Sequence, residues 1–302
     1  MDSALLANQA SIRFPNLGIE IDSMRKSIEI FGIDIAFYGM IIATGMLLAM
    51  CLVFHEAKIT GQKVDHYYDL ALFLIVFGVI GARIYYVAFK WEDYKDNLAD
   101  IFKIRNGGLG IYGGVLAGIL VILIFSKIKK LNPFQMMDAV ILGVLVGQIL
   151  GRWGNFFNRE AFGGYTDNLL AMQIRLDEVG GIISDSVRNH IVIVDGAEYI
   201  QVHPTFLYES LWNLVLLLAI IVCKRFKKFH GQMFAWYAIG YGVGRFFVEG
   251  LRTDQLIAPI VNVAISRIVA VGMILAGIVI LLLGHMGKGP FVKTGNPERK
   301  TE

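Results

Sequence analysis

The feature that most constrains this chain is a series of seven apolar windows, each about as long as a membrane-spanning helix. A helix needs about 20 mostly apolar residues to cross the hydrocarbon core of a bilayer. The runs are too long and too weakly alternating to be the strands of a membrane barrel. The sequence therefore predicts an all-α integral membrane protein with seven transmembrane helices, at residues 35–54, 70–89, 108–126, 134–151, 205–223, 232–249 and 265–284.

The composition agrees with a lipid environment and excludes several other classes. The chain is 56% hydrophobic and only 18% charged, whereas soluble domains are about 25% charged. A soluble fold of this size could not bury so much apolar surface. The net charge of +3 is too small to suggest a nucleic-acid partner. Cys51 and Cys223 lie inside apolar runs, so we expect neither a disulfide framework nor a metal site, and no cofactor is implied.

The basic residues of the short loops give the helices a direction, because cytoplasmic loops are enriched in Lys and Arg. The loops KIKKLNP (127–133) and KRFKKFH (224–230) are basic and contain no acid, whereas the 90–106 loop balances its bases with acids. We therefore expect the N-terminus outside and the C-terminus inside. The expected parts are an extracytoplasmic arm (1–34), helices one to four (35–151), a signature loop and small extracytoplasmic cap (152–204) with one or two short strands, helices five to seven (205–284) and a cytoplasmic tail (285–302).

In this orientation the few polar residues of the apolar windows lie near the outer leaflet. Charged groups at membrane depth are costly and usually functional. Arginine presents a rigid fork of donors that suits phosphate, so Arg152 and Arg245, on separate helices, could clamp a phospholipid headgroup. Asn155 could donate to the same group, and nearby glutamates could orient the arginines. The residues at this depth are Tyr38, Arg83, Arg152, Asn155, His203, Glu209, Arg245, Glu249, Arg267 and the segment NGGLGIYGG (106–114).

Each of these features also has a purely structural interpretation. Snorkelling or packing explains Arg83 as well as function does, and Arg245 with Glu249 could be a simple i, i+4 ion pair. Gly113 and Gly114 are typical of close helix packing. The 106–114 segment lacks the Lys-Ser/Thr of a P-loop and follows no strand, which argues against nucleotide binding. The shared depth of the polar residues is what favours a site.

The most specific string, GRWGNFFNREAFGG (151–164), resembles the signature of the prolipoprotein diacylglyceryl transferases, which are enzymes of the bacterial inner membrane. Similar segments follow in the family's order over residues 30–285: FYG (37–39), GARIYYV (81–87), NGGLGIYGG (106–114), HPTFLYES (203–210) and GYGVGRFFVEGLRTD (240–254). The resemblance implies transfer of the diacylglyceryl group of phosphatidylglycerol to the lipobox cysteine in the signal peptide of a preprolipoprotein. A thioether forms and glycerol phosphate leaves.

The resemblance also implies roles for particular residues. Among the catalytic residues we expect Arg152, Arg245, Tyr112 and Glu249. The expected headgroup-binding residues are Tyr38, Arg152, Asn155, Glu160, Gly163, His203, Tyr241 and Arg245. The resemblance supplies no motif for the stretch around Ser266 and Arg267, and Arg267 is assigned nothing beyond a phosphate contact.

Tyr112 is a departure from the family, which commonly has His-Gly-Gly where this chain has Tyr112-Gly113-Gly114. With a reference pKa near 10, tyrosine is a poor base at neutral pH. A thiol has a reference pKa near 8.5, which neighbouring arginines lower. We therefore favour electrostatic activation, in which Arg152 and Arg245 hold the phosphate, stabilise its leaving charge and favour the thiolate. Tyr112 would donate a hydrogen bond.

Two other classes of protein compete with this interpretation. A transporter of a lipid or small anionic solute could use the same polar cluster, but transporters favour internal repeats and broken helices at the bilayer midplane. A structural scaffold gives no reason for arginines at one depth. For the transferase we also expect lateral openings to lipid and guidance of the signal peptide by residues 165–202.

Overall fold

The computed structural model describes residues 10–22, 24–104, 107–258 and 261–291. The chain divides into two compact units. One unit combines residues 1–49 with residues 142–302, and the other is residues 50–141.

A long helix occupies every one of the seven predicted windows. The helices are α2 (Phe37–Ile59), α3 (Val64–Phe89), α4 (Ile111–Lys129), α5 (Pro133–Asn158), α7 (Thr205–Cys223), α8 (Gln232–Glu249) and α9 (Ile265–His285). Among the described residues, six helices are long and apolar enough to cross a membrane, which makes this a multi-pass membrane protein. Helix α8 is not in that set, because Gln232, Arg245 and Glu249 make its 18 residues less apolar.

Helices α3 and α4 form the main contact of the 50–141 unit, and glycines allow them to approach closely. A Cβ on Gly81 would lie 2.4 Å from Cβ of Ala117, and a Cβ on Gly113 would lie 2.3 Å from the carbonyl oxygen of Gly81. Neither position could accept a side chain without moving the other helix. The structural interpretation of Gly113 is therefore supported.

Arg83 of α3 has a structural role in the same unit. Its guanidinium donates to four carbonyl oxygens of the connection between α3 and α4, at 2.7–2.9 Å, and it lies 4.9 Å from the centre of the Tyr94 ring. The side chain is buried. The four acceptors belong to Asp100, Ile101, Gly107 and Gly108, so Arg83 fixes the path of the glycine-rich segment. That connection also holds the short 3-10 turns η2 (Trp91–Asp93) and η3 (Leu98–Phe102).

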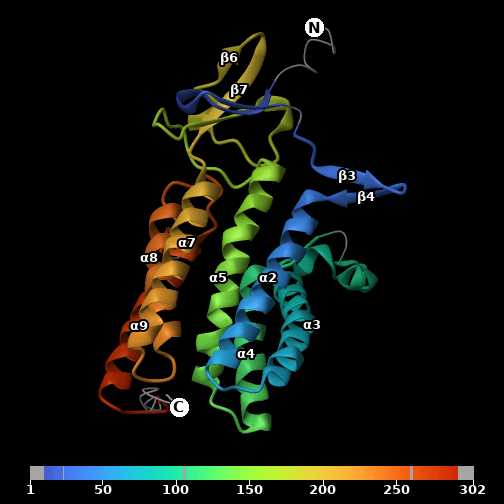
Figure 1. The fold of residues 1–302 in the computed structure, drawn as a ribbon. Coiled ribbons are helices and arrows are strands. Elements are labelled where there is room, and N and C mark those ends of the chain that lie inside the picture. The colour runs from blue at the N-terminus through green and yellow to red at the C-terminus, as the bar shows by residue number, and fades with distance from the viewer. Residues whose placement is uncertain (1–9, 23, 105–106, 259–260, 292–302) are drawn as a thin grey trace. The chain divides into compact units, whose positions relative to one another are not determined.

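In the other unit, α7, α8 and α9 lie side by side (Figure 1). Hydrogen bonds also join α5 to α7: Nε1 of Trp153 donates to Oγ of Ser210 at 3.1 Å, and that hydroxyl donates to the carbonyl of Ile149 at 3.1 Å. Near the end of α5, Gly154 leaves room for an aromatic ring, since a Cβ there would lie 2.4 Å from Cδ2 of Tyr38 in α2.

A five-stranded antiparallel sheet adjoins the start of α7 (Figure 1). Its strand order is β2-β1-β5-β7-β6. The bounds are β1 (Ala10–Phe14), β2 (Ile19–Asp22), β5 (Met172–Arg175), β6 (Val192–Val194) and β7 (Ala197–Val202), with the one-turn helix α6 (Asp185–Arg188) beside them. Its core contains Ile12, Ile174 and Ile200, all fully buried, packed with Phe162 and Phe206.

This sheet extends the all-α prediction, which allowed only one or two short strands between residues 152 and 204. Strand β1 pairs with β5, as in the register Ile12 with Ile174, so the N-terminal arm and the cap share one sheet. The strands are three to six residues long, too short for a clear alternating pattern. Two further hairpins, β3 (Ser27–Ile30) with β4 (Ile33–Ala36) and β8 (Ile257–Ala258) with β9 (Val263–Ala264), stand outside it.

Candidate functional site

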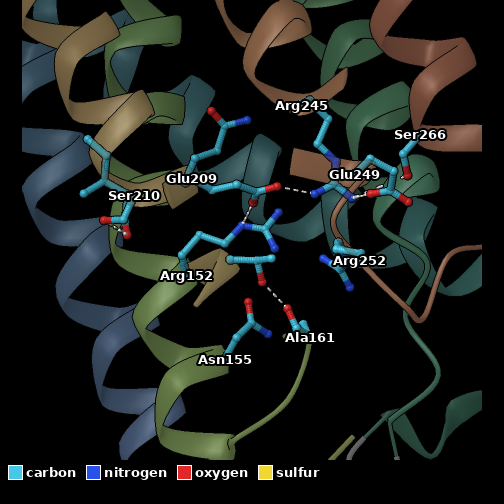
Figure 2. A network of polar contacts seen from close by, with 12 residues as sticks. Arg152, Asn155, Ala161, Glu209, Ser210, Arg245, Glu249, Arg252 and Ser266 are labelled. Atoms are coloured by element: carbon cyan, nitrogen blue, oxygen red, sulfur yellow. Dashed lines mark hydrogen bonds and ion pairs between the residues drawn. The ribbon is translucent and has the colours of Figure 1, made fainter. Parts of the chain in front are cut away.

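Two arginines from different helices meet on one buried carboxylate. Glu209, in the first turns of α7, forms an ion pair with Nε of Arg152 near the end of α5 and with Nη1 of Arg245 near the end of α8. Figure 2 shows both guanidinium groups reaching this carboxylate. The Glu209 side chain is only 5% exposed. The sequence prediction that Arg152 and Arg245 lie together is therefore confirmed for these two residues.

Arg245 is held on its other side by Glu249. Nη2 of Arg245 lies 2.5 Å from Oε2 of Glu249, one turn later in α8, and donates to Oγ of Ser266 in the first turn of α9 at 3.4 Å. The i, i+4 pair expected as a structural alternative therefore exists, but as part of a larger network. Two carboxylates fix Arg245 from opposite sides (Figure 2).

Arg152 is less completely occupied. Glu209 contacts its Nε, and its side chain is 22% exposed. Among the described residues, its two terminal nitrogens, Nη1 and Nη2, have no hydrogen-bond partner. A guanidinium anchored by Nε with both terminal N–H groups available matches the fork geometry by which arginine binds phosphate or carboxylate.

The turn after α5 brings Glu160 back onto the end of its own helix. The amide nitrogens of Asn155 and Asn158 each donate to Oε1 of Glu160 at 3.1 Å. Arg159 and Ala161 adopt positive φ angles of 56° and 57°, which reverse the chain there. Oγ1 of Thr205 donates to the carbonyl of Ala161 at 2.5 Å and ties the turn to α7.

Gly163 lies where three segments meet and no side chain fits. A Cβ there would lie 2.8 Å from Cβ of His203 and 2.8 Å from the carbonyl oxygen of Leu251. Its N–H donates to the His203 carbonyl at 3.0 Å, and the neighbouring Gly164 N–H donates to Leu251 at 2.9 Å. Gly163 therefore joins the segment before α7 to the segment after α8, and its role in the structure is close backbone packing.

His203 precedes α7 and is partly buried. Its Nδ1 lies 3.3 Å from the hydroxyl of Tyr208, which accepts a hydrogen bond from Asn168 at 3.1 Å. Burial lowers the pKa of His203 below its ordinary value, so its neutral form is favoured.

Tyrosines extend the polar face of α8 below Arg245. Tyr241 stacks on Tyr237 with ring centres 5.5 Å apart, and the Tyr237 hydroxyl accepts a hydrogen bond from Nε2 of Gln148 in α5 at 2.9 Å. Tyr237, Tyr241, Arg245 and Glu249 are spaced four residues apart and so follow one face of the helix. The side chains of the predicted site residues Tyr241, Arg245 and Glu249 therefore project from the same face of α8.

Tyr112 and Arg83 belong to the 50–141 unit. Tyr112 lies in the first turn of α4, with its ring centre 6.3 Å from that of Tyr85. Its part in the site therefore stays a prediction.

Comparison with known proteins decides the family. A family model described as prolipoprotein diacylglyceryl transferase matches residues 25–283. The chain belongs to this family. It is 41% identical over 254 residues to the phosphatidylglycerol–prolipoprotein diacylglyceryl transferase of Clostridioides difficile, covering 83% of this chain and 93% of the relative. The same-named enzyme of Listeria monocytogenes serotype 4b is 38% identical over 264 residues (87% and 91%), and that of Enterococcus faecalis is 36% identical over 274 residues (90% and 94%).

Membership of the transferase family favours the enzyme over the transporter and the scaffold. Within the 1–49 and 142–302 unit, the family's motifs are brought to one end of the helices, next to the sheet (Figure 1). The predicted residues in or near these helix ends are Tyr38, Arg152, Asn155, Glu160, Gly163, His203, Arg245 and Glu249, whereas Tyr241 lies at the middle of α8.

Some residues have contacts that the sequence analysis did not anticipate. Arg159 forms an ion pair with Glu178 at 2.7 Å and also donates to the carbonyl of Met24. Burial lowers the pKa of Arg159, and Glu178 opposes that effect. The signature string contains Arg159, but its partners could not be read from the sequence, because Glu178 and Met24 lie in other segments of the chain. Arg252 forms a bidentate ion pair with Asp254: Nε donates to Oδ1 at 2.9 Å and Nη2 donates to Oδ2 at 2.7 Å.

Arg267, to which the sequence analysis assigns only a phosphate contact, lies near the end of α8. Its Nε donates to the carbonyl of Phe246 at 3.3 Å, and its guanidinium lies 5.0 Å from the centre of that ring. These contacts hold α9 against α8. Among the described residues there is no group of three or more His, Cys, Asp and Glu side chains that could hold a metal ion.

Proposed function

We propose that this protein transfers the sn-1,2-diacylglyceryl group of phosphatidylglycerol to the lipobox cysteine of a preprolipoprotein signal peptide. Family membership supports the reaction, and the meeting of Arg152 and Arg245 on Glu209 supports the place where it occurs. The cysteine sulfur forms a bond to the glycerol carbon that carried the phosphate. The carbon–oxygen bond to phosphate breaks, its electron pair stays on the phosphate oxygen, and glycerol phosphate leaves.

In this proposal the terminal nitrogens of Arg152 bind the phosphate. Glu209 holds Nε of Arg152, which fixes the direction of the remaining N–H groups before substrate arrives. Preorganised donors aimed at developing charge are typically the largest contribution to catalysis. Arg245 adds positive charge in the same place, fixed by Glu209 and Glu249. The two cations stabilise the leaving phosphate and favour the thiolate over the thiol.

The headgroup would contact further residues around this centre. Asn155 and Glu160 are already hydrogen-bonded to each other, so they present a fixed polar edge to the glycerol hydroxyls. Tyr38, His203 and Tyr241 complete the proposed headgroup-binding set, Gly163 keeps its backbone close to His203, and Tyr112 donates a hydrogen bond. Glu249 acts through Arg245.

We also propose the finer topology. Counting α8 as a span gives seven crossings, which place the N-terminus outside and the C-terminus inside a bacterial inner membrane. The ion pairs of Arg245 with Glu209 and Glu249 support this count, because they neutralise the charges that make α8 less apolar. The sheet would then form an extracytoplasmic cap over which residues 165–202 guide the signal peptide, and phosphatidylglycerol would enter laterally from the bilayer.

The test uses the full-length protein in phosphatidylglycerol nanodiscs with a synthetic lipobox peptide. Mass spectrometry should show the peptide gaining one diacylglyceryl group through its cysteine. Arg152→Ala should reduce the rate by about 10²-fold or more, as expected for loss of a preorganised donor to developing charge. The matched control is Arg225→Ala, since Arg225 is exposed in η6 (Lys224–Phe226) at the opposite end of α7.

Two results would overturn the proposal. One is a folded wild-type protein that produces no diacylglyceryl peptide from phosphatidylglycerol. The other is a rate for Arg152→Ala equal to that of Arg225→Ala, which would place the chemistry away from the arginine cluster.

A further inference from the structure

A two-stranded hairpin, β3 with β4, stands immediately before α2 and has no place in the proposed reaction. Its register is regular, with Ile28 opposite Ile35 and Glu29 opposite Asp34. The N–H of Phe37, the first residue of α2, donates to the carbonyl of Lys26 at 3.0 Å. The base of the hairpin is therefore closed against the start of the helix, and the hairpin cannot turn freely about it.

The register gives the hairpin two chemically different faces. Successive side chains of a strand point to opposite faces, and directly paired residues share a face. Ile28, Ile30 and Ile35 therefore share one face, and Glu29 and Asp34 share the other. Two like charges directly opposite each other are destabilising unless water screens them. The acidic face is thus stable only in contact with water, whereas the isoleucine face is more stable when an apolar surface covers it.

The tip of the hairpin carries an unusual aromatic residue. Phe31 is 100% exposed. It has a φ of 51° and the following Gly32 has a φ of 77°, as in the tight turns that favour Asn-Gly or Gly-Gly. A bulky residue in the left-handed region is rare. A phenylalanine that is both strained and fully exposed gains nothing from contacts within the described part of this protein.

This hairpin is also too small to be stable alone in water. An isolated two-stranded hairpin is marginal at best, and it needs a third strand or a covering element. Within the described residues, neither β3 nor β4 pairs with a third strand. Ile28 and Ile30 remain about 40% exposed. A partner outside the described residues must therefore cover the isoleucine face.

The surroundings identify lipid as that partner. Helix α2 begins directly after β4, and its first half leaves Met40, Met46 and Leu47 exposed for contact with hydrocarbon. The hairpin therefore starts at the level where a spanning helix enters the bilayer. Arg25 and Lys26 at its base are exposed, and basic residues at this level are attracted to anionic phospholipids. Aromatic residues concentrate at the same level.

We propose that the β3–β4 hairpin is a membrane-interface anchor. Its isoleucine face and Phe31 lie in the lipid of the leaflet where α2 begins, and Glu29 and Asp34 face water. It holds the entry of α2, and with it Tyr38, at a fixed depth. This anchor goes beyond the transferase proposal and does not depend on it.

The test measures the depth of single spin labels in the full-length protein in phosphatidylglycerol-containing nanodiscs. The two natural cysteines, Cys51 and Cys223, are both exposed and are first replaced by alanine. Labels are placed at Ile28→Cys and Phe31→Cys on the proposed lipid side, with Glu29→Cys and Asp34→Cys as matched controls on the opposite face. Electron paramagnetic resonance then gives the collision rate of each label with oxygen, which concentrates in lipid, and with a water-soluble nickel chelate.

The anchor predicts an oxygen-to-nickel collision ratio several-fold higher at positions 28 and 31 than at positions 29 and 34. Equal nickel access on both faces would place the hairpin in water and overturn the proposal. Shielding of positions 28 and 31 from both reagents would also overturn it, because a protein surface or second copy would then cover that face.

A second measurement tests the anchor without cysteine substitutions, in case the cysteine variants do not fold. Phe31→Trp, with the natural cysteines retained, should add tryptophan emission that brominated phospholipids quench. Ile193→Trp is the control, because Ile193 is 70% exposed on β6 of the five-stranded sheet, away from the hairpin (Figure 1). Equal quenching of the added emission at both positions would contradict the anchor.

Discussion

Nη2 of Arg159 lies 2.7 Å from Oε2 of Glu178, and this ion pair joins the turn after α5 to the sheet. Glu178 ends the short turn η5 (Leu176–Glu178) that follows β5. Arg159 is only 3% exposed and also donates to the carbonyl of Met24, which follows β2. One guanidinium therefore connects the turn that carries Glu160 with two separate segments that follow strands of the five-stranded sheet.

Loss of this ion pair should destabilise the protein. Glu178→Gln leaves the buried Arg159 charge without its anionic partner, which typically costs about 3 kcal/mol. The measurement is thermal unfolding of the purified protein in detergent. The control is Glu20→Gln, because Glu20 pairs with Arg13 while 55% exposed, and exposed pairs contribute about 1 kcal/mol or less. Equal loss of stability in the two variants would contradict the assigned role of Arg159.

Glu209→Gln should separate substrate binding from turnover. The change removes the acceptor that orients Arg152 and Arg245, so we expect kcat to fall about 10²-fold, or about 2.7 kcal/mol in activation free energy. It also removes a negative charge beside the proposed phosphate position, so KM for phosphatidylglycerol should not rise. The control is Glu198→Gln on β7, which is exposed. A higher KM with unchanged kcat would show that Glu209 does not act by orienting the arginines.

Tyr112→Phe should retain transfer activity to within about tenfold. If the arginines favour the thiolate electrostatically, no general base is needed at position 112, and a base typically contributes 10²–10⁴-fold. Rates are compared for wild type, Tyr112→Phe and Tyr112→His in the lipobox-peptide assay. A loss of several orders of magnitude in the phenylalanine variant, restored in full by histidine, would show that a base acts here.

Gly81→Ala should destabilise the contact between α3 and α4. The added methyl group would meet Cβ of Ala117 and the Gly113 carbonyl at 2.4 and 2.7 Å, and such overpacking typically costs about 1–3 kcal/mol. Gly78→Ala, one turn earlier in α3, is the matched control, because a Cβ at that position would have no neighbouring atom within 4 Å. Thermal unfolding in detergent compares the two, and an equal midpoint for both would contradict the close approach of these helices.

Stability should fall as the pH is lowered from 7.5 to 5.5. Burial lowers the pKa of His203 in the folded state, so in this range the unfolded state binds protons more readily. Stability from such a group is present above its unfolded pKa of about 6.5 and is lost as the pH falls. His230 shifts in the same direction, from burial and from Lys227. His203→Gln should reduce the slope of unfolding midpoint against pH, and His203→Gln with His230→Gln should reduce it further. An unchanged slope in the double variant would contradict the lowered pKa values.

The helices could be predicted, and candidate residues for the site could be named, because their signals are local. A run of about 20 apolar residues is sufficient to indicate a helix in a bilayer. The signature string places Arg152, Asn155 and Glu160 within nine residues of one another, so their proximity follows from chain connectivity. The end of α5 was less predictable. The helix continues to Asn158 through polar residues that carry no apolar signal.

The sheet could not be predicted because its pairings are distant. Strand β1 pairs with β5 about 160 residues later, as in the register Ile12 with Ile174. Neither strand alternates over enough residues to be distinguished from a loop. The structural role of Arg83 was equally unpredictable. Its acceptors are main-chain carbonyl oxygens, and because every residue has one, the sequence does not show which of them Arg83 contacts.

The sequence by itself determined three things: that this is a membrane protein, which residues form its long helices, and which family it resembles. Hydrophobicity and motifs are properties of residues that are close in the sequence. Only the tertiary structure decided which charges neutralise one another. Arg152, Glu209 and Arg245 come from three helices, and a buried charge is stable only where the fold supplies its partner. The same holds for the β3–β4 hairpin: its alternating residues are visible in the sequence, but only the strand register shows that one face is apolar and that no third strand pairs with it among the described residues.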